Sequence, residues 1–233
     1  MQVTFLEARN EFLKLCPKWE HIWGSDTYCL LTQADLDWFR IPRSTRLLDY
    51  GCGSGFLTYA LRRWWYTVDC YGYDSLAWGE RESTWLKADI PCYCAVPPMR
   101  FDNVMMHACI EHCADPDAEL RRVHAMLPEG GRLYIARCPE KWSWAEFVAR
   151  HVLRWGTSHD TRYTWRSIEE LLTRNGFVVE RHERTDFVTA YPARFTNKMV
   201  RPLLALNWLM LHSPLRVFAH HHRLVAVKRG GAE

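Results

Sequence analysis

Apolar runs alternate with amphipathic stretches through the middle of the chain. An apolar run over residues 46–50 ends in a glycine-rich turn, and the segment from Phe56 to Trp64 then has the pattern of a helix with basic residues in its last turn. Three more runs predict strands at 67–73, 84–88 and 101–107. The first two of these are followed by an acid, Asp74 and Asp89, and this order predicts strand, turn and helix units of a parallel sheet.

The second half of the chain continues the alternation. Asp115 followed by proline predicts a helix start, and apolar positions recur at helical spacing up to Leu127. A later helix is predicted after a cap at Thr164 or Ser167. Strands are predicted at 132–138, 177–183 and 223–228. The pattern therefore favours an α/β fold with an open, doubly wound sheet, in which ligands bind at the carboxyl ends of strands: at 49–55, Asp74, Asp89 and His107.

Length and composition fit one globular chain with appended segments. The 233 residues are 48% hydrophobic and 24% charged, which excludes disordered and collagen-like chains. Four regions are predicted: an N-terminal helical cap (1–45), a ligand-binding core (46–183), a basic helical lid inserted between the last two strands (184–222), and a final strand and tail (223–233).

Charge is concentrated near the end of the chain. The whole sequence carries only +3, which gives no reason to expect nucleic acid binding. Residues 191–233 hold seven basic side chains and one acid. This region predicts either a lid packed on the core, a peripheral membrane contact through 196–219, or attraction of an anionic acceptor.

Three features predict a cytoplasmic protein. Glu7 stands where a secretory signal carries basic residues, and the apolar stretch 203–211 is far shorter than the roughly 20 residues of a membrane span. Nine cysteines, an odd number, fit reduced thiols better than a disulfide framework.

The glycine turn favours a cationic nucleoside ligand over a nicotinamide. Gly51, Gly53 and Gly55 allow close approach of the backbone, but Phe56 stands where a dinucleotide fingerprint needs glycine. Asp49 would repel a pyrophosphate and suits an ammonium or sulfonium group. Asp74 can accept hydrogen bonds from ribose hydroxyls.

These residues resemble a known family. Residues 47–56 (LLDYGCGSGF) look like motif I of the class I S-adenosylmethionine-dependent methyltransferases, and 71–74 (YGYD) look like the acidic end of their second strand. Residues 101–104, 110–116, 127–131 and 175–177 resemble the small-molecule branch that includes quinone-biosynthesis enzymes. The resemblance covers about residues 40 to 183 and implies a Rossmann-like seven-stranded sheet in a three-layer sandwich, with strand seven antiparallel.

The resemblance also implies the cofactor and its contacts. The acid and glycines of the turn would line the methionine part of S-adenosylmethionine, Asp74 would hold the ribose, and Asp89 with Ile90 would flank the adenine. His107 would meet both cofactor and acceptor. The cofactor-binding set implied is Asp49, Gly51, Cys52, Gly53, Gly55, Asp74, Ser75, Asp89, Ile90 and His107.

The implied reaction is transfer of a methyl group to a small-molecule acceptor by in-line displacement, with S-adenosylhomocysteine as product. Alignment of the two reactants provides much of the acceleration, and an oxygen acceptor, which is slightly favoured, needs a base. The candidate bases are His107, His112 and His159, because an unperturbed histidine titrates near neutrality.

Other interpretations remain open. The fold could serve as an inactive cofactor-binding partner or regulatory subunit, or as a lipid or quinone enzyme at a membrane surface. Trp142, Trp144, Trp155 and Trp165 could line a pocket for a flat or lipid-like acceptor, or simply pack in the core. Cysteine pairs at 92 and 94 and at 109 and 113 lack good zinc spacing, so no metal is expected.

Overall fold

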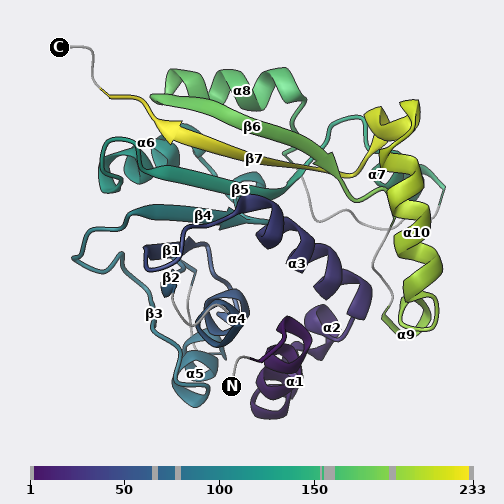
Figure 1. Ribbon diagram of the computed structural model, residues 1–233, viewed down its shortest axis with the longest axis horizontal. Coiled ribbons are helices and arrows are strands. Elements are labelled where there is room, and N and C mark those ends of the chain that lie inside the picture. The colour runs from purple at the N-terminus through teal and green to yellow at the C-terminus, as the bar shows by residue number, and fades with distance from the viewer. Residues whose placement is uncertain are drawn as a thin grey trace. The chain divides into compact units, whose positions relative to one another are not determined.

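The computed structural model describes residues 3–64, 68–76, 80–152, 154, 161–188 and 193–230. The chain forms two compact units: unit 1 comprises Met1–Met106 with Ala190–Lys198, and unit 2 comprises His107–Thr189 with Met199–Glu233. Seven strands are hydrogen-bonded in the order β3-β2-β1-β4-β5-β7-β6, and β7 is antiparallel to both of its neighbours (Figure 1). This topology confirms the Rossmann-like sheet with an antiparallel last strand.

The elements have the following bounds. The strands are β1 (Arg46–Tyr50), β2 (Asp69–Tyr73), β3 (Cys92–Tyr93), β4 (Asn103–His107), β5 (Arg132–Pro139), β6 (Phe177–Thr185) and β7 (His221–Lys228). The α-helices are α1 (Phe5–Leu15), α2 (Glu20–Trp23), α3 (Asp26–Phe39), α4 (Phe56–Trp64), α5 (Glu80–Lys87), α6 (Pro116–Met126), α7 (Trp144–His151), α8 (Trp165–Arg174), α9 (Ala193–Thr196) and α10 (Val200–Leu211). The 3₁₀ helices are η1 (Pro17–Trp19), η2 (Ile110–His112) and η3 (Pro214–Phe218).

In unit 1, a buried strand carries the glycine turn. Leu47 and Leu48 are fully buried on β1, which pairs in parallel with β2 on one side and β4 on the other. Such double coverage explains the continuous apolar run in the sequence. Among the N-terminal helices, α1 begins at a capping box of Thr4 and Glu7 and packs on α4.

In unit 2, β7 lies between β5 and β6, and α8 runs along β6 (Figure 1). The Asp115 side chain accepts from the Ala118 amide at the start of α6, and Thr164 forms a capping box with Ser167 at the start of α8, so both predicted caps are confirmed. The pairing of β5 with β7 shifts register between Ile135 and Cys138, as in a β-bulge.

The strand predicted at 84–88 is wrong. Residues Glu80–Lys87 form α5, and the third strand is the two-residue segment Cys92–Tyr93. Thr84, Trp85 and Ala88 are the buried positions, and their spacing places them on one face of a helix rather than on alternate positions of a strand. A short apolar run does not by itself distinguish these two periods.

Candidate functional site

The glycine turn after β1 has the backbone conformation that its sequence predicts. Gly51, Gly53 and Gly55 have φ of 78°, 54° and 77°, in the left-handed region that side chains with a Cβ rarely adopt. The amides of Gly51 and Cys52 both donate to the Tyr73 carbonyl oxygen, at 2.7 and 3.0 Å. The turn is therefore fixed to the carboxyl end of β2, one of the strand ends expected to carry the site.

Asp49, on β1 two residues before Gly51, is a buried acid. Its side chain is 1% exposed, and Oδ2 accepts a hydrogen bond from Thr58 Oγ1 at 2.9 Å. Burial, with a smaller contribution from the charge of Asp74, raises the pKa of Asp49 to about 7, although the Thr58 hydrogen bond opposes the shift. Near neutral pH this group is poised between its two protonation states.

Asp74, the residue that follows β2, contacts the glycine turn through its carboxylate. Its Oδ2 accepts from the Gly53 amide at 2.8 Å, while Oδ1 accepts from the Leu76 amide and from Arg81 Nη1, both at 2.9 Å. A carboxylate offers about four lone-pair positions, so roughly one remains for a ligand hydroxyl while Arg81 stays in place. Among the described residues, none lies within 4 Å of the position that a Cβ of Gly53 would occupy, so these residues leave space for a ligand on this side.

Trp85 is part of this site and was missed in the sequence, where it lay in the wrongly predicted strand. Its Nε1 donates to the Gly53 carbonyl oxygen at 3.1 Å. A Cβ added to Gly55 would come within 2.9 Å of the indole ring, so the close approach of Trp85 requires glycine there. Thr58 and Arg81 were also missed, since nothing in their spacing links them to Asp49 or Asp74.

The remaining cofactor candidates of unit 1 lie around α5 and the end of β2. Asp89 is exposed and has a φ of 50° just after α5, so it does not end a strand as expected. Ile90 is buried and lines a cavity of about 560 Å³ together with Trp85 and Cys92. Ser75 is exposed in the turn after Asp74. Their roles toward an adenosine remain predictions.

In unit 2, His107 at the end of β4 belongs to a buried charged cluster. Arg137 Nη1 lies 3.0 Å from Asp186 Oδ2, and His221 Nδ1 lies 2.9 Å from the same oxygen. Burial, reinforced by Arg137, lowers the pKa of His107 to about 3, so its imidazole is neutral at physiological pH. Within the described residues, His107 Nε2 is buried without a hydrogen-bond partner.

Asp186 is the centre of that cluster. Although burial opposes ionisation, Arg137 and His221 hold the pKa of Asp186 below its ordinary value. The carboxylate is thus ionised and paired. Nothing local in the sequence indicates this cluster, because Arg137, in β5, and Asp186, just after β6, are 49 positions apart.

The other two candidate bases are less informative. His112 has a side chain that is 50% exposed, with Nε2 3.9 Å from Glu111 Oε1. His159 lies outside the described residues, as does Trp155.

In the part of the chain that the structure describes, no three His, Cys, Asp or Glu side chains converge on a point that could hold a metal, and the nine cysteines are free thiols. None of the described helices has both the length and the apolar character needed to cross a bilayer.

Comparisons with known proteins identify the family and the fold of the chain. A family model described as a methyltransferase domain matches residues 25–182. No curated protein matches the chain. A chain from a complex that contains the Haloferax volcanii Trm112 methyltransferase activator is similar in structure, with a TM-score of 0.62, 17% identity, and coverage of 99% of this chain and 100% of that one.

Two further solved structures show the same fold. One is an S-adenosylmethionine-dependent methyltransferase from Thermotoga maritima, with a TM-score of 0.60, 12% identity, and coverage of 97% of this chain and 100% of that one. The other is the Burkholderia thailandensis 1,6-didemethyltoxoflavin-N1-methyltransferase, which was solved with 1,6-didemethyltoxoflavin and S-adenosylhomocysteine. Its TM-score is 0.55 at 16% identity, covering 97% of this chain and 89% of that one.

Proposed function

The chain belongs to the methyltransferase domain family, with the fold of the class I S-adenosylmethionine-dependent enzymes, and from this premise we propose that it methylates a small-molecule acceptor. The observation that carries the proposal is the turn between Asp49 and Asp74. Its three glycines have left-handed φ, the Gly51 and Cys52 amides donate to β2, and none of the described residues fills the space beside Gly53. Backbone of this kind accepts a nucleoside ligand in close contact.

The residues of unit 1 would divide the cofactor between them. Asp49 is almost inaccessible, so it would act as a nearby negative charge toward the cationic end of the ligand rather than by direct contact. The backbone of Gly51, Cys52, Gly53 and Gly55 would face the methionine part. Asp74 and Ser75 would take the ribose, and Asp89 and Ile90 the adenine.

When bound, S-adenosylmethionine supplies an activated methyl group, so the protein's task is chiefly alignment. His107 fits a positioning role. Its neutral imidazole, with a buried Nε2 that has no partner among the described residues, can accept a hydrogen bond from an acceptor hydroxyl. A pKa of about 3 makes it a weak proton acceptor, which leaves His112 and His159 as the better candidates for a base if the acceptor is an oxygen.

Asp74→Ala is expected to weaken binding of S-adenosylmethionine by about 1.5–3 kcal/mol, the scale of a charge-assisted hydrogen bond. The loss arises because the ribose hydroxyls and the Gly53 amide lose their shared acceptor. Isothermal titration calorimetry with S-adenosylmethionine, S-adenosylhomocysteine and NADH would measure it.

Arg81→Gln serves as the matched control for Asp74. It removes a cation from the same carboxylate while leaving the acceptor in place, so affinity should be unchanged or higher. Unchanged affinity in Asp74→Ala would remove Asp74 from the ribose role, and tight NADH binding would contradict the choice of cofactor. Stoichiometric binding without turnover on any acceptor class would favour an inactive partner or regulatory subunit.

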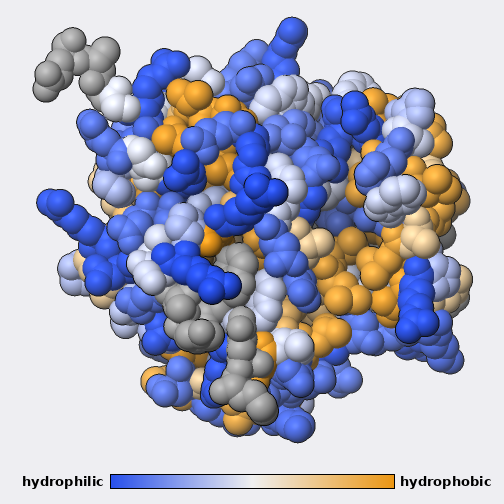
Figure 2. All heavy atoms as spheres, viewed as in Figure 1, coloured by the Kyte–Doolittle hydropathy of each residue, from blue (hydrophilic) through white to orange (hydrophobic). Residues whose placement is uncertain are grey.

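A membrane-surface enzyme is a second candidate, because α10 packs with the amide side chain of Asn207 inward and leaves apolar side chains exposed. Asn207 is the buried residue of this helix, and its Oδ1 accepts from the Phe187 amide at 2.6 Å. Leu206, Trp208 and Leu209 are instead 46–61% exposed. Figure 2 shows this hydrophobic surface over α10 at the right of the view. The exposed Arg201 and Arg216 would complement anionic lipid headgroups.

We expect the protein to sediment with phosphatidylglycerol vesicles more than with phosphatidylcholine vesicles. Replacing Trp208 and Leu209 together with serine should reduce bound protein at least about fivefold, because it removes two large apolar side chains from the contact. Val178→Ser, at an exposed apolar position on β6, is the control and should bind as the unmodified protein does. Equal sedimentation of all three proteins would mean that α10 is not the membrane contact, and no excess on phosphatidylglycerol vesicles would contradict the membrane-surface proposal.

A further inference from the structure

A cavity of about 570 Å³ lies in unit 2, in the segments that follow β5 and precede α8. In doubly wound sheets, ligands bind in the loops beyond the carboxyl ends of strands, and the wall of this cavity begins two residues after the end of β5. Its volume suits a small organic molecule. None of the residues around it belongs to the glycine turn.

Aromatic side chains form much of the wall and are unusually exposed. Trp142, Trp144, Phe147 and Phe218 are 64%, 46%, 61% and 45% exposed, although each would gain by burial. They come from the loop after β5, from α7 and from η3, so elements far apart in sequence contribute to one apolar surface. Trp144 is held in place, since its Nε1 donates to the Phe187 carbonyl oxygen at 3.2 Å. Such a wall fits a flat or apolar ligand body.

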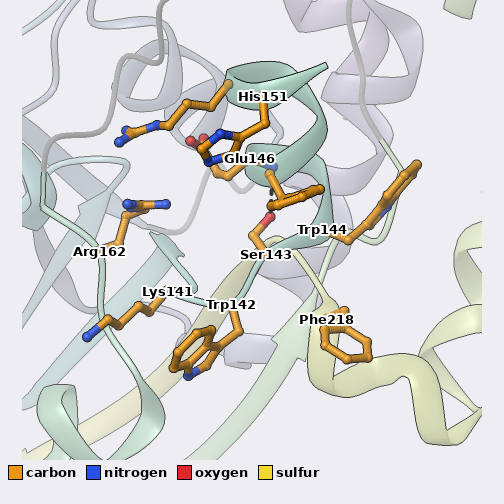
Figure 3. A pocket seen from close by; sticks show the side chains of 10 residues that line it. Lys141, Trp142, Ser143, Trp144, Glu146, His151, Arg162 and Phe218 are labelled. Atoms are coloured by element: carbon orange, nitrogen blue, oxygen red, sulfur yellow. Dashed lines mark hydrogen bonds between the residues drawn. The ribbon is translucent and has the colours of Figure 1, made fainter. Parts of the chain in front are cut away.

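Arg162 adds a cation to this apolar wall. Its side chain is half-buried, and Figure 3 shows the guanidinium directed into the space between the surrounding side chains. Within the described residues it forms no ion pair. Lys141, which lies 5.7 Å from the centre of the Trp142 ring, and Arg150 also line the cavity and contribute further positive charge.

Glu146, the acidic side chain in the lining of the pocket, repels a bound anion only weakly. Glu146 is 6% exposed and turns toward His220, whose Nε2 lies 4.0 Å from its Oε1. A guanidinium in an apolar pocket is favourable when an anion pairs with it, ideally a carboxylate or phosphate that it can contact through two N–H groups.

From this combination we propose that the cavity binds an acceptor made of a planar apolar body and an anionic group, carboxylate or phosphate. That it is the methyl acceptor rests on the proposed function. The aromatic side chains enclose the body and Arg162 receives the anion. Binding itself needs no cofactor, so it can be tested separately from methyl transfer.

The test uses three probes that share one ring system and differ in charge: 2-naphthoate, 2-naphthamide and 2-naphthylmethylamine. Calorimetric titration of the full chain should show 2-naphthoate binding at least tenfold more tightly than the amide, with the cationic amine weakest. Arg162→Gln should reduce the preference for the acid to less than threefold. Trp142→Ala should instead weaken acid and amide by similar factors, because it removes apolar contact only.

Arg166→Gln is the matched control, since it removes an exposed arginine four positions away on α8 without touching the pocket. It should leave the preference intact. Equal binding of acid and amide to the unmodified protein, or an unchanged preference in Arg162→Gln, would overturn the proposal. A naphthyl phosphate compared with the naphthoate then separates phosphate from carboxylate ligands.

S-adenosylhomocysteine binding to the same preparations separates the two proposals. Intact S-adenosylhomocysteine binding without any naphthoate preference would refute the anionic pocket and leave the methyltransferase assignment standing. A preference for naphthoate without S-adenosylhomocysteine binding would support the anionic pocket and contradict the proposed use of S-adenosylmethionine. In Arg162→Gln, retained S-adenosylhomocysteine affinity also shows that the variant is folded.

Discussion

Asp186→Asn is expected to lower the free energy of unfolding by about 3–5 kcal/mol, because it leaves Arg137 buried without its counter-ion. Arg137 and Asp186 are each about 4% exposed at the side chain and 3.0 Å apart, so water cannot replace the lost partner. Asparagine keeps the shape of the side chain and tolerates the left-handed φ of 58° at this position. Urea unfolding at pH 7, followed by circular dichroism, measures the change.

Two comparisons show whether the loss comes from the buried pair. Glu180→Gln breaks the Arg132–Glu180 ion pair, whose side chains are about 40% exposed, and should cost less than about 1 kcal/mol. Arg137→Met combined with Asp186→Asn should cost less than the sum of the single changes, because no buried charge is left unpaired. A loss below about 1 kcal/mol for Asp186→Asn alone would mean that Arg137 is otherwise compensated.

The pH dependence of this contribution follows from the lowered pKa of Asp186. An acid whose pKa is lower in the folded state stabilises the fold above its unfolded pKa of 3.8, and that stabilisation is lost as pH falls toward the folded value. The destabilisation caused by Asp186→Asn should therefore become smaller as pH is lowered below about 3.8, which urea unfolding at pH 5 and pH 3 would measure.

The sheet could be predicted from the sequence because its information is local. The buried strands are continuous apolar runs, and the caps at Asp115 and Thr164 satisfy helix amides a few residues away. The strand prediction at 84–88 was wrong because a short apolar run fits both the period of a strand and that of a helix. The extent of β6 and β7 was underestimated, because their ends carry polar residues such as Arg184 and His222, each of which lies 3.0 Å from Glu140 just after β5.

The residues of the candidate site likewise fall into those that the sequence indicates and those that it does not. The glycines, Asp49 and Asp74 lie in motifs that are visible in the sequence, and the structure brings them together at one turn. Thr58, Arg81 and Trp85 act through contacts that span 7 to 32 positions and carry no local signal. His221 lies in the basic segment 191–233 and was not singled out in the sequence, whereas in β7 it is buried against Asp186.

Asp49→Asn is expected to stabilise the ligand-free protein at pH 8 by on the order of 2–4 kcal/mol, because it removes a buried charge. The folded chain retains the proton of Asp49 up to about pH 7, whereas the unfolded chain releases it near 3.8. The unmodified protein therefore loses stability as pH rises from about 4 to 7, and the variant does not. Urea unfolding at pH 5 and pH 8 should show a small gain at the lower pH and the full gain at the higher.

The same substitution should weaken S-adenosylmethionine binding about tenfold or more at pH 8, and S-adenosylhomocysteine binding less, because only the former carries a sulfonium charge. A cation beside a buried carboxyl group favours its ionised form, so the affinity of the unmodified protein should rise from pH 5 to pH 7.5. In Asp49→Asn this part of the pH dependence disappears. Asp102→Asn, at an exposed acid in the same unit, should change neither affinity nor its pH dependence.

Together, the unfolding and binding measurements on Asp49→Asn show why an acidic side chain is buried next to the glycine turn. A variant that is more stable without ligand but binds the sulfonium less well would mean that Asp49 is retained for the ligand at a cost to the fold. A variant that loses stability at both pH values would show instead that the Thr58 hydrogen bond to the carboxylate holds the turn together. The cation preference of the site would then have to come from Asp74, which the Asp74→Ala titration measures independently.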